Sequence, residues 1–491
     1  MRRPSHTQPR HSLASALLLV ALLTACGGDS STAPPPPPPS VSRLVVAAGD
    51  SQIVGAGRAV DVVPSVTALD ASGNPVAGVA VTFSVSSGGG SATSASATTN
   101  ATGIATIGSW TLGTSAGANA LTASASGRTV AVKAFGVADG ISTGGTHTCG
   151  IAAGGIALCW GANSYGQLGN GELTINQLPT PVSGGLTFRA LTNGYEHTCG
   201  LVVDGSVYCW GRNSNGQLGV GDNTQRSTPT RVSGDVKFAA IAAGQKHTCA
   251  LDESGVAYCW GYNEYLGLGV GDNTDRLVPT RVTGVPAFTS ITAGLGHSCG
   301  VAANGAAYCW GFDASGQLGI GSFVGAAPPA PVLGSINFRE LEAGQNYTCG
   351  IAIDALAYCW GYNGDHQLGI GDLPEQTVPK PSGDVLRYTK FAAAFAHTCG
   401  LSDNRHIYCW GRNFRGQLGV GDRLDRLNLN IASADLTFTT VTTGGFDSCG
   451  LSPDGTAYCW GDNVSGQLGV ADDVDRLSPA PVLGFVFLGL P

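Results

Sequence analysis

Cysteines and the histidines beside them carry most of the side-chain chemistry of this sequence, and both recur at fixed intervals. A first cysteine returns every fifty residues and a second follows ten residues later, seven times in all. Two thiolates and an imidazole can bind zinc, whereas two thiols alone can form a disulfide. A histidine stands two residues before the first cysteine in five units, at His147, His197, His247, His297 and His397. The cysteine pairs are Cys149 and Cys159, Cys199 and Cys209, Cys249 and Cys259, Cys299 and Cys309, Cys349 and Cys359, Cys399 and Cys409, and Cys449 and Cys459.

The local sequence of the second unit favours the disulfide. Residues 201–208 are typical of two strands joined by a three-residue turn that ends at Gly205, where a left-handed backbone is needed. Counting outward from that turn places Cys199 opposite Cys209 at a close pair without hydrogen bonds, with Cα atoms about 4.5 Å apart. We expect each such disulfide to stabilise the fold by about 2 to 3 kcal/mol and to require an oxidising compartment.

Metal binding and catalysis are the alternatives to a structural role. Tyr347 and Asp447 replace the histidine in two units, and disulfides would use up the thiolates, so we expect structural histidines, no metal and no cofactor. Acidic runs at 272–275 and 472–475 could suggest calcium, but they lack the glycine and distal glutamate of a helix-loop-helix site and are better explained as turn caps. Because no catalytic set stands out from the repeat, we expect no catalytic residues and no enzyme activity.

Short strands must position these residues. The composition has 74 glycines and 12% charged residues, which suits strands and tight turns better than long helices. Each second cysteine precedes Trp-Gly, and most units continue to Gly-Gln-Leu-Gly, as at 216–219. A fifty-residue period with a tryptophan and turn signals indicates the blades of a β-propeller, in which each tryptophan should pack against a neighbouring blade.

At these motifs the sequence resembles the regulator of chromosome condensation repeat family. The matching pattern is Ala-Gly-x-x-His-Thr-Cys, then Asp-Gly-x-Val-Tyr-Cys-Trp-Gly-x-Asn-x-x-Gly-Gln-Leu-Gly, with few departures such as Asp313 for the asparagine. Seven such repeats make a closed propeller in that family, so the resemblance implies a seven-bladed β-propeller over residues 138–491. We expect residues 485–490 to complete the first blade, because the matching stretch before that blade is poorly formed.

Positions that vary between the units are the best candidates for a binding site. The residues just before His-Thr-Cys and those after Trp-Gly should lie at the same end of each strand pair, and therefore on one rim of the propeller. They are rich in tyrosine, arginine and phenylalanine, as protein-binding surfaces are. The expected partner-binding rim consists of Tyr165, Tyr195, Arg212, Tyr262, Tyr265, Phe312, Tyr362, Phe395, Arg412, Phe414, Arg415 and Phe446.

The first forty residues are expected to direct and anchor the protein. Arginines precede a short apolar run at 13–23, which indicates a signal peptide over residues 1–25. The sequence Leu-Thr-Ala-Cys-Gly that ends at Gly27 resembles the lipobox of bacterial lipoproteins, which implies acylation of Cys26. Residues 26–40 contain six consecutive prolines and should form an extended tether. We expect a cell-envelope lipoprotein, at the outer membrane or cell surface, that contacts the membrane only through this anchor.

Residues 41–137 are expected to form a β-sandwich, because short apolar runs alternate there with turn signals. The stretches 70–79 and 99–105 resemble bacterial Ig-like domains of the invasin and intimin type. Such domains often act as stalks, although some take part in adhesion, and the lack of a cysteine or charged cluster favours a spacer here. The expected fold is therefore all-β, with an Ig-like β-sandwich followed by a seven-bladed β-propeller.

Three functions remain open from the sequence. We favour a binding module outside the cytoplasm that recognises another protein, in adhesion, inhibition or scaffolding. Guanine-nucleotide exchange on a small GTPase is implied by the family resemblance alone and would need a cytosolic partner. A carbohydrate-binding or structural surface protein is the third, since an aromatic rim also suits a glycan. The net charge of −8 argues against nucleic acid and anionic lipid as ligands.

Overall fold

The protein is all-β in the computed structural model, which describes residues 40–55, 59–60, 62–113, 117–137, 140–382 and 386–484. The one helical segment among these residues is a 3-10 turn at Ala153–Gly155. Within the same ranges, no helix is long and apolar enough to cross a membrane. The expected signal peptide, Cys26 and the proline-rich tether lie outside the described residues.

The first ten strands form a β-sandwich, as expected. One sheet has the order β1-β3-β7 and the other the order β2-β10-β9-β4-β6, while β5 and β8 pair separately. In β4, Val81 and Phe83 are buried and the residues beside them are exposed, and both pack in one core with Trp110. The resemblance of this sandwich to invasin-type Ig-like domains stays a prediction. The strands are β1 (Arg43–Ala48), β2 (Gln52–Gly55), β3 (Ser65–Leu69), β4 (Ala80–Ser87), β5 (Gly90–Thr93), β6 (Ser96–Thr98), β7 (Ile104–Thr106), β8 (Ser109–Leu112), β9 (Gly117–Ala125) and β10 (Arg128–Val137).

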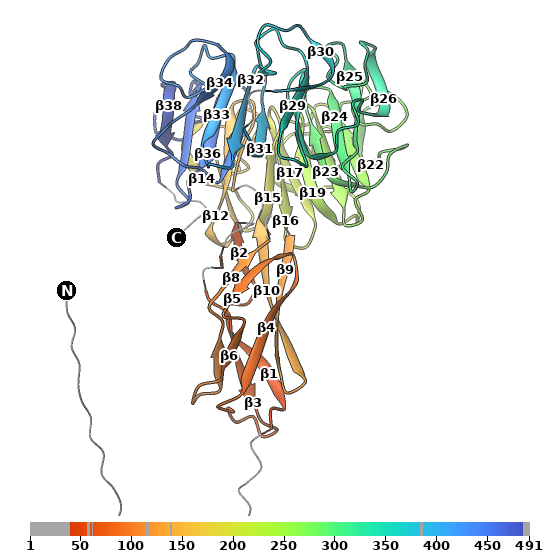
Figure 1. Ribbon diagram of the computed structural model, residues 1–491. Helices are drawn as coiled ribbons and strands as arrows, with labels where there is room; N and C mark the ends of the chain where they lie inside the picture. The colour runs from red at the N-terminus through yellow and green to blue at the C-terminus, as the bar shows by residue number, and fades with distance from the viewer. Residues whose placement is uncertain are drawn as a thin grey trace, which may run out of the picture. The chain divides into compact units, whose positions relative to one another are not determined.

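Seven four-stranded antiparallel sheets follow, each built from four consecutive strands (Figure 1). They are the blades of the expected β-propeller, numbered 1 to 7 along the chain, and the first strand of each blade lines a central channel. The blades are β11 (Ile141–Thr143), β12 (His147–Ala152), β13 (Ile156–Gly161) and β14 (Asn176–Pro181); β15 (Phe188–Asn193), β16 (His197–Val202), β17 (Val207–Gly211) and β18 (Arg226–Arg231); β19 (Phe238–Ala243), β20 (His247–Asp252), β21 (Ala257–Gly261) and β22 (Arg276–Arg281); β23 (Phe288–Ala293), β24 (His297–Ala302), β25 (Ala307–Asp313) and β26 (Gly325–Pro331); β27 (Phe338–Ala343), β28 (Tyr347–Ala352), β29 (Ala357–Gly361) and β30 (Gln376–Pro381); β31 (Tyr388–Ala393), β32 (His397–Ser402), β33 (Ile407–Gly411) and β34 (Arg426–Ile431); and β35 (Thr440–Thr443), β36 (Asp447–Leu451), β37 (Ala457–Gly461) and β38 (Arg476–Pro481).

Tryptophan side chains join each blade to the one before it. The Trp210 indole N–H of blade 2 donates to the Gln167 carbonyl oxygen of blade 1 at 2.9 Å. Equivalent bonds run around the ring, and Trp160 of blade 1 donates to the Gln467 carbonyl oxygen of blade 7 at 2.9 Å. Each of these indoles is fully buried. The predicted packing of each tryptophan against a neighbouring blade is therefore confirmed, and the ring is closed.

The innermost strand of blade 1 is short. β11 has three residues, whereas β15 in the same place of blade 2 has six. The hydroxyls of Thr143 and Thr442 nevertheless lie 2.9 Å apart across the joint with blade 7. Residues 485–490, which we expected to complete the first blade, lie outside the described residues, so that expectation stays a prediction.

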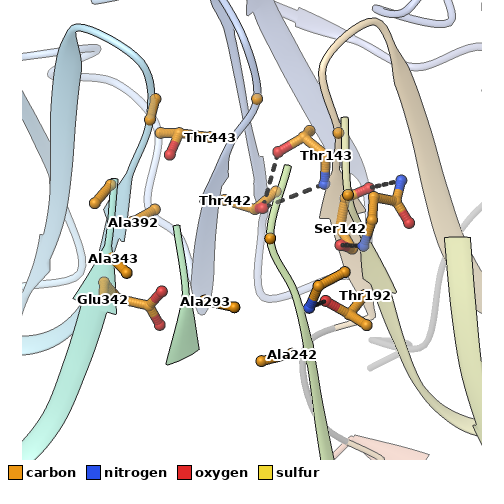
Figure 2. A pocket seen from close by; sticks show the side chains of 18 of the residues that line it. Ser142, Thr143, Thr192, Ala242, Ala293, Glu342, Ala343, Ala392, Thr442 and Thr443 are labelled. Carbon is orange, nitrogen blue, oxygen red and sulfur yellow. Dashed lines mark hydrogen bonds between the residues drawn. The ribbon is translucent and has the colours of Figure 1, made fainter. Parts of the chain in front are cut away.

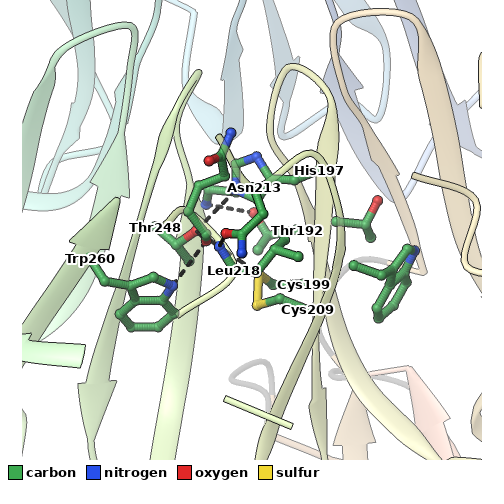
Figure 3. Close-up of a disulfide and its surroundings, with 12 residues drawn as sticks. Thr192, His197, Cys199, Cys209, Asn213, Leu218, Thr248 and Trp260 are labelled. Carbon is green, nitrogen blue, oxygen red and sulfur yellow. Dashed lines mark hydrogen bonds between the residues drawn. A yellow bond between two sulfur atoms is a disulfide. The ribbon is translucent and has the colours of Figure 1, made fainter. Parts of the chain in front are cut away.

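A disulfide joins the two central strands of every blade. Cys199 lies directly opposite Cys209 in the register of β16 and β17, and their Cα atoms are 4.1 Å apart (Figure 3). The other six pairs have Cα separations of 4.1 or 4.2 Å. Each first cysteine is thus bonded to the cysteine ten residues later in its own blade.

Candidate functional site

One rim of the propeller carries the loops that the sequence singles out. In each blade, the turn between the first two strands and the long loop between the last two leave the same end of the sheet, because neighbouring strands are antiparallel. In blade 2 these segments are residues 194–196 and 212–225. We call this surface, with its equivalents in the other blades, the loop rim. The turns between the second and third strands occupy the opposite rim.

Repeated polar side chains fix the backbone of the long loops. In blade 2, the side-chain oxygen of Asn213 accepts the Leu218 N–H at 3.0 Å, and its amide donates to the Asp222 carbonyl oxygen at 2.7 Å. The Gln217 side chain accepts the Asn215 N–H at 2.9 Å. Asn213 and Gln217 are both buried. Hydrogen bonds within the loop therefore fix its backbone, and the variable side chains project from that fixed backbone.

The acidic runs of these loops cap turns, as expected. Asp272 Oδ1 accepts the Thr274 N–H at 2.9 Å, and Oδ2 accepts from Arg276 at 2.7 Å. The bond from Arg276, and after it the bond from Thr274, lowers the pKa of Asp272. Asp275 Oδ1 accepts the Asn263 N–H at 2.8 Å. The equivalent run of blade 7 makes the same three kinds of contact, so protein donors engage these carboxylates.

Histidines link neighbouring blades beneath the loop rim. His197 Nε2 lies 3.0 Å from Thr248 Oγ1 of the next blade, and the Thr248 hydroxyl donates to the Gln217 carbonyl oxygen at 2.9 Å (Figure 3). Since that hydroxyl proton is used, Nε2 must donate. Burial lowers the pKa of His197 to about 3, so the ring is neutral at pH 7. The other four histidines of the repeat make the same contact.

Two blades replace this histidine, with different results. The Tyr347 hydroxyl lies 2.9 Å from Thr398 Oγ1, so blades 5 and 6 stay linked. In blade 7, both carboxyl oxygens of Asp447 are buried without a hydrogen-bond partner among the described residues. Burial first, and the nearby charge of Asp462 second, raise the pKa of Asp447 well above its usual range. The joint between blades 7 and 1, which we call the seam, therefore has no such contact to Thr148 in the described part of the chain.

Three of the expected rim residues meet across the seam. Tyr195 of blade 2 and Phe395 of blade 6 stack with ring centroids 5.5 Å apart, and Phe446 of blade 7 lies 5.8 Å from Phe395. Gly145 of blade 1 makes room for this pair, because a Cβ there would lie 2.3 Å from a Tyr195 ring carbon. We call Tyr195, Phe395 and Phe446 the aromatic clasp. All three side chains are half-buried, so they pack between blades and are also partly exposed on the loop rim.

Five more expected residues form two smaller groups on the loop rim. Tyr265 contacts Tyr262 and Phe312, with centroid distances of 6.0 and 4.9 Å. In the neighbouring sector, the Arg212 guanidinium lies 4.9 Å above the Tyr165 ring. Neighbouring side chains already cover part of each of these rings. The rings are therefore weaker evidence for a protein-binding site than fully exposed rings would be.

The remaining expected residues centre on Phe414. Arg412 and Arg415 lie over its ring at 4.8 and 5.6 Å, and its other neighbour is Phe446 at 4.9 Å, so this group adjoins the aromatic clasp. Tyr362 is half-buried in blade 5. The structure thus places every predicted rim residue on the loop rim, but it divides them among several groups and does not gather them in one site.

Sequence reasoning missed the most exposed apolar residues of this rim. Leu424, Val464 and Val474 expose 66, 59 and 58% of their surface. Blades 2 and 3 have threonine at the loop position that Leu424 and Val474 occupy in blades 6 and 7. This change from a polar to an apolar residue could have indicated the exposed site from the sequence. In blade 1, Leu173 and Ile175 are also apolar and more than half exposed. We call the set Phe414, Leu424, Val464, Val474, Leu173 and Ile175 the apolar arc.

Contacts between neighbouring loops hold the apolar arc together. Arg423 of blade 6 donates to the Phe414 carbonyl oxygen at 2.8 Å and pairs with Asp475 of blade 7 at 2.9 Å. The blade 7 loop packs in turn on blade 1, where a Cβ on Gly466 would lie 2.7 Å from the Gln177 side chain. The loops that carry the arc therefore contact one another over blades 6, 7 and 1.

Comparison with known families identifies the repeats. The regulator of chromosome condensation (RCC1) repeat matches residues 155–201, 204–251, 254–301 and 454–487. A second model of the same repeat matches residues 139–167, 238–265, 288–317, 388–417 and 438–467. No curated protein sequence matches the chain significantly.

Solved propellers share the fold at low sequence identity. Yeast RCC1 (Prp20), in its complex with Kap60, is 22% identical with a TM-score of 0.61, over 67% of this chain and 83% of that one. Prp20p from Saccharomyces cerevisiae, described with its binding to Gsp1p and histones, is 22% identical with a TM-score of 0.61, over 67 and 85% of the two chains. Human WBSCR16 is 22% identical with a TM-score of 0.57, over 64 and 86%. With its matched repeats and seven four-stranded blades, the propeller of this chain belongs to the RCC1 repeat family.

Proposed function

We propose that the loop rim binds another protein outside the cytoplasm, with the apolar arc at the centre of the contact. The apolar arc itself carries this proposal, because five of its side chains expose more than half of their surface, from 51% at Leu173 to 66% at Leu424. Contiguous exposed apolar side chains on a folded domain mark interaction sites. Phe414 and the arginines beside it add residue types that are enriched in protein interfaces, and arginine is also common among hot spots.

The charges around the arc suit a partner surface of low net charge. Arg415 lies 3.5 Å from carboxylate oxygens of both Asp462 and Asp475, and Arg423 lies 2.9 Å from Asp475. Because these guanidinium groups already face carboxylates of their own chain, the arc offers little excess positive charge to phosphates. A protein partner could cover the apolar side chains and leave the ion pairs at the edge of the contact.

We infer the compartment from the sequence features, and the disulfides support it. The seven disulfides require an oxidising environment, which supports export by the signal peptide. Anchoring through acylated Cys26 at the cell envelope rests on the lipobox-like sequence that ends at Gly27. The binding would then serve adhesion, inhibition or scaffolding at the outer membrane or cell surface. Nucleotide exchange on a GTPase would need the cytosol, where such disulfides are rare.

Site-specific photo-crosslinking in the full-length lipoprotein tests the proposal. A photoreactive amino acid at Val464, in cells that make the protein naturally, should give a discrete adduct with another protein. Ile353, which is 70% exposed on the opposite rim, is the matched control position and should give none. Leu424→Glu should remove the adduct at Val464 and weaken binding of the identified partner about tenfold or more, as loss of a hot spot does.

The other outcomes separate the alternatives. An adduct from Ile353 alone would move the contact to the opposite rim and overturn the proposal. A polysaccharide adduct at Val464 would favour carbohydrate binding, and a cytosolic GTPase adduct would favour nucleotide exchange.

A further inference from the structure

The central channel of the propeller encloses about 310 Å³ and is lined by the innermost strands of all seven blades. This volume lies at the lower end of the roughly 300 to 1,000 Å³ of small-molecule sites. The channel is separate from the apolar arc, and nothing in the proposed function uses it.

At two successive wall positions of this channel, neutral hydroxyl and amide side chains gather on one side, whereas Glu342 and Lys390 line the other side. At these positions, blade 7 supplies Thr442 and Thr443, and the next two blades supply Ser142 with Thr143 and Thr192 with Asn193. The other four blades have alanine at one or both positions, and Glu342 stands on the far wall (Figure 2). The neutral hydrogen-bonding groups at these two positions therefore lie mostly on the side formed by blades 7, 1 and 2.

The hydroxyls on the polar side still have protons to donate. Ser142 Oγ accepts the Asn193 N–H at 3.1 Å, and Thr192 Oγ1 accepts the Ala243 N–H at 2.9 Å. Both oxygens therefore act as acceptors towards the next blade. A serine or threonine hydroxyl is also a donor, so each keeps one O–H for another group.

Acceptors without a partner lie beside these donors. Asn193 donates its amide to the Ser142 carbonyl oxygen at 3.0 Å, but its side-chain oxygen is buried with no hydrogen-bond partner among the described residues. Thr443 Oγ1 is likewise buried and unpartnered in the described part of the chain. Asn193 is only 7% exposed, so leaving its oxygen unsatisfied is costly. The polar side thus combines hydroxyl donors with buried acceptors that have no partner among the described residues.

Two members of the aromatic clasp also line this channel. Tyr195 and Phe395 line the cavity as well as stacking on each other. An aromatic surface next to several hydroxyls and amides is complementary to a ring that has apolar C–H faces and polar O–H edges. Pyranose sugars combine these two features.

We propose that the channel binds a neutral, polyhydroxylated ligand of monosaccharide size. Asn193 and Thr443 accept from its hydroxyls, Ser142 and Thr192 donate to them, and the ring of the ligand lies near the aromatic clasp. This site does not depend on partner binding at the loop rim.

Isothermal titration of the full mature chain tests the site, with D-glucose, D-galactose and N-acetyl-D-glucosamine as probes and L-leucine as a non-sugar of similar size. At least one sugar should bind, and leucine should not. Thr443→Val keeps the side-chain shape and removes an unpartnered hydroxyl. It should weaken sugar binding about tenfold, the effect of one lost hydrogen bond, and raise the unfolding midpoint of the unliganded chain.

Thr292→Val, in blade 4 on the other side of the same channel, is the matched control. Its hydroxyl accepts the Ala343 N–H at 3.1 Å, so its removal should lower the unfolding midpoint and leave sugar affinity within about twofold. Absence of binding by all three sugars at 50 mM would overturn the proposal. So would unchanged affinity in Thr443→Val, or a lowered midpoint in that variant, which would give the hydroxyl a purely structural role.

Discussion

The rings of Tyr195 and Phe395 stack 5.5 Å apart although their strands belong to blades 2 and 6 of the propeller. Blades 7 and 1 lie between them, and each has glycine at the equivalent position, Gly445 and Gly145. The clasp therefore occupies space that only these two glycines leave open. The clasp reinforces the ring at the seam. Among the described residues at this joint, Asp447 does not make the hydrogen bond to the next blade that the histidines make at their own joints.

Gly145→Ala should destabilise the propeller by about 1 to 3 kcal/mol, because the added Cβ would lie 2.3 Å from the Tyr195 ring and force the clasp apart. Urea unfolding measures the change. Gly296→Ala is the control, since its Cβ would meet its nearest neighbours at 3.4 Å. Equal stability of the two variants would show that Tyr195 moves aside at no cost.

Asp447→Asn should change how stability depends on pH. The folded pKa of Asp447 lies well above its unfolded value of about 3.9, so the carboxyl favours folding at low pH and loses that contribution as pH rises through the folded pKa. The free energy of unfolding of the wild type should fall relative to Asp447→Asn by about 1.4 kcal/mol per pH unit within that window. Denaturant unfolding from pH 4 to 8 measures the difference, and parallel curves would contradict the assignment.

Asp447→His tests the seam itself. An imidazole at this position could donate to Thr148, as His197 does to Thr248 at 3.0 Å, and thereby restore the missing contact. We expect this variant to be more stable than the wild type at pH 7, by about 1 kcal/mol for one added buried hydrogen bond. A loss of stability would show that the seam has no room for the ring.

The buried histidines should make the propeller sensitive to acid. Burial lowers the pKa of His297 to about 3, so it favours folding above its unfolded value of about 6.5 and loses that contribution as pH falls towards 3. At pH 5 the loss reaches about 2 kcal/mol for this one residue. His297→Gln does not titrate, so its stability deficit at pH 7 should shrink by about that amount at pH 5. An unchanged deficit would mean that His297 takes up its proton within the fold.

The disulfides should be complete in exported protein. Mass spectrometry with and without reduction should find no free thiol among the paired cysteines, because each pair is bonded within its own blade. Replacing both Cys199 and Cys209 with alanine should cost about 2 to 3 kcal/mol, the contribution of a short disulfide loop. Free thiols throughout would contradict the proposed compartment.

The blades could be predicted because each is determined by local sequence. The turn at Gly205 fixes the register that brings Cys199 to Cys209, and the following tryptophan alternates to the other face of its strand. The fifty-residue period then repeats the same geometry, so the sequence of one unit predicts the strands, disulfide and tryptophan position of all seven blades.

The candidate site could be predicted only in part. The repeat places Tyr195 and Phe395 on the loop rim, but it gives no sign that side chains from blades 2 and 6 meet across the axis. The replacement at Asp447 is plain in the sequence, yet its effect depends on a threonine in the next blade. The apolar arc depends likewise on loops that pack only after the ring has closed.

Every joint between blades uses one carbonyl oxygen of the preceding blade. The Gln217 carbonyl accepts from Thr248 at 2.9 Å and from Trp260 at 3.0 Å, and the carbonyl of Gly267 serves the next joint equally well without a side chain. Because the bonding groups sit at the same places in each unit, a duplicated or transplanted blade would bring both halves of its joints with it. The loops that face a partner can therefore diverge while the bonds at the joints stay the same.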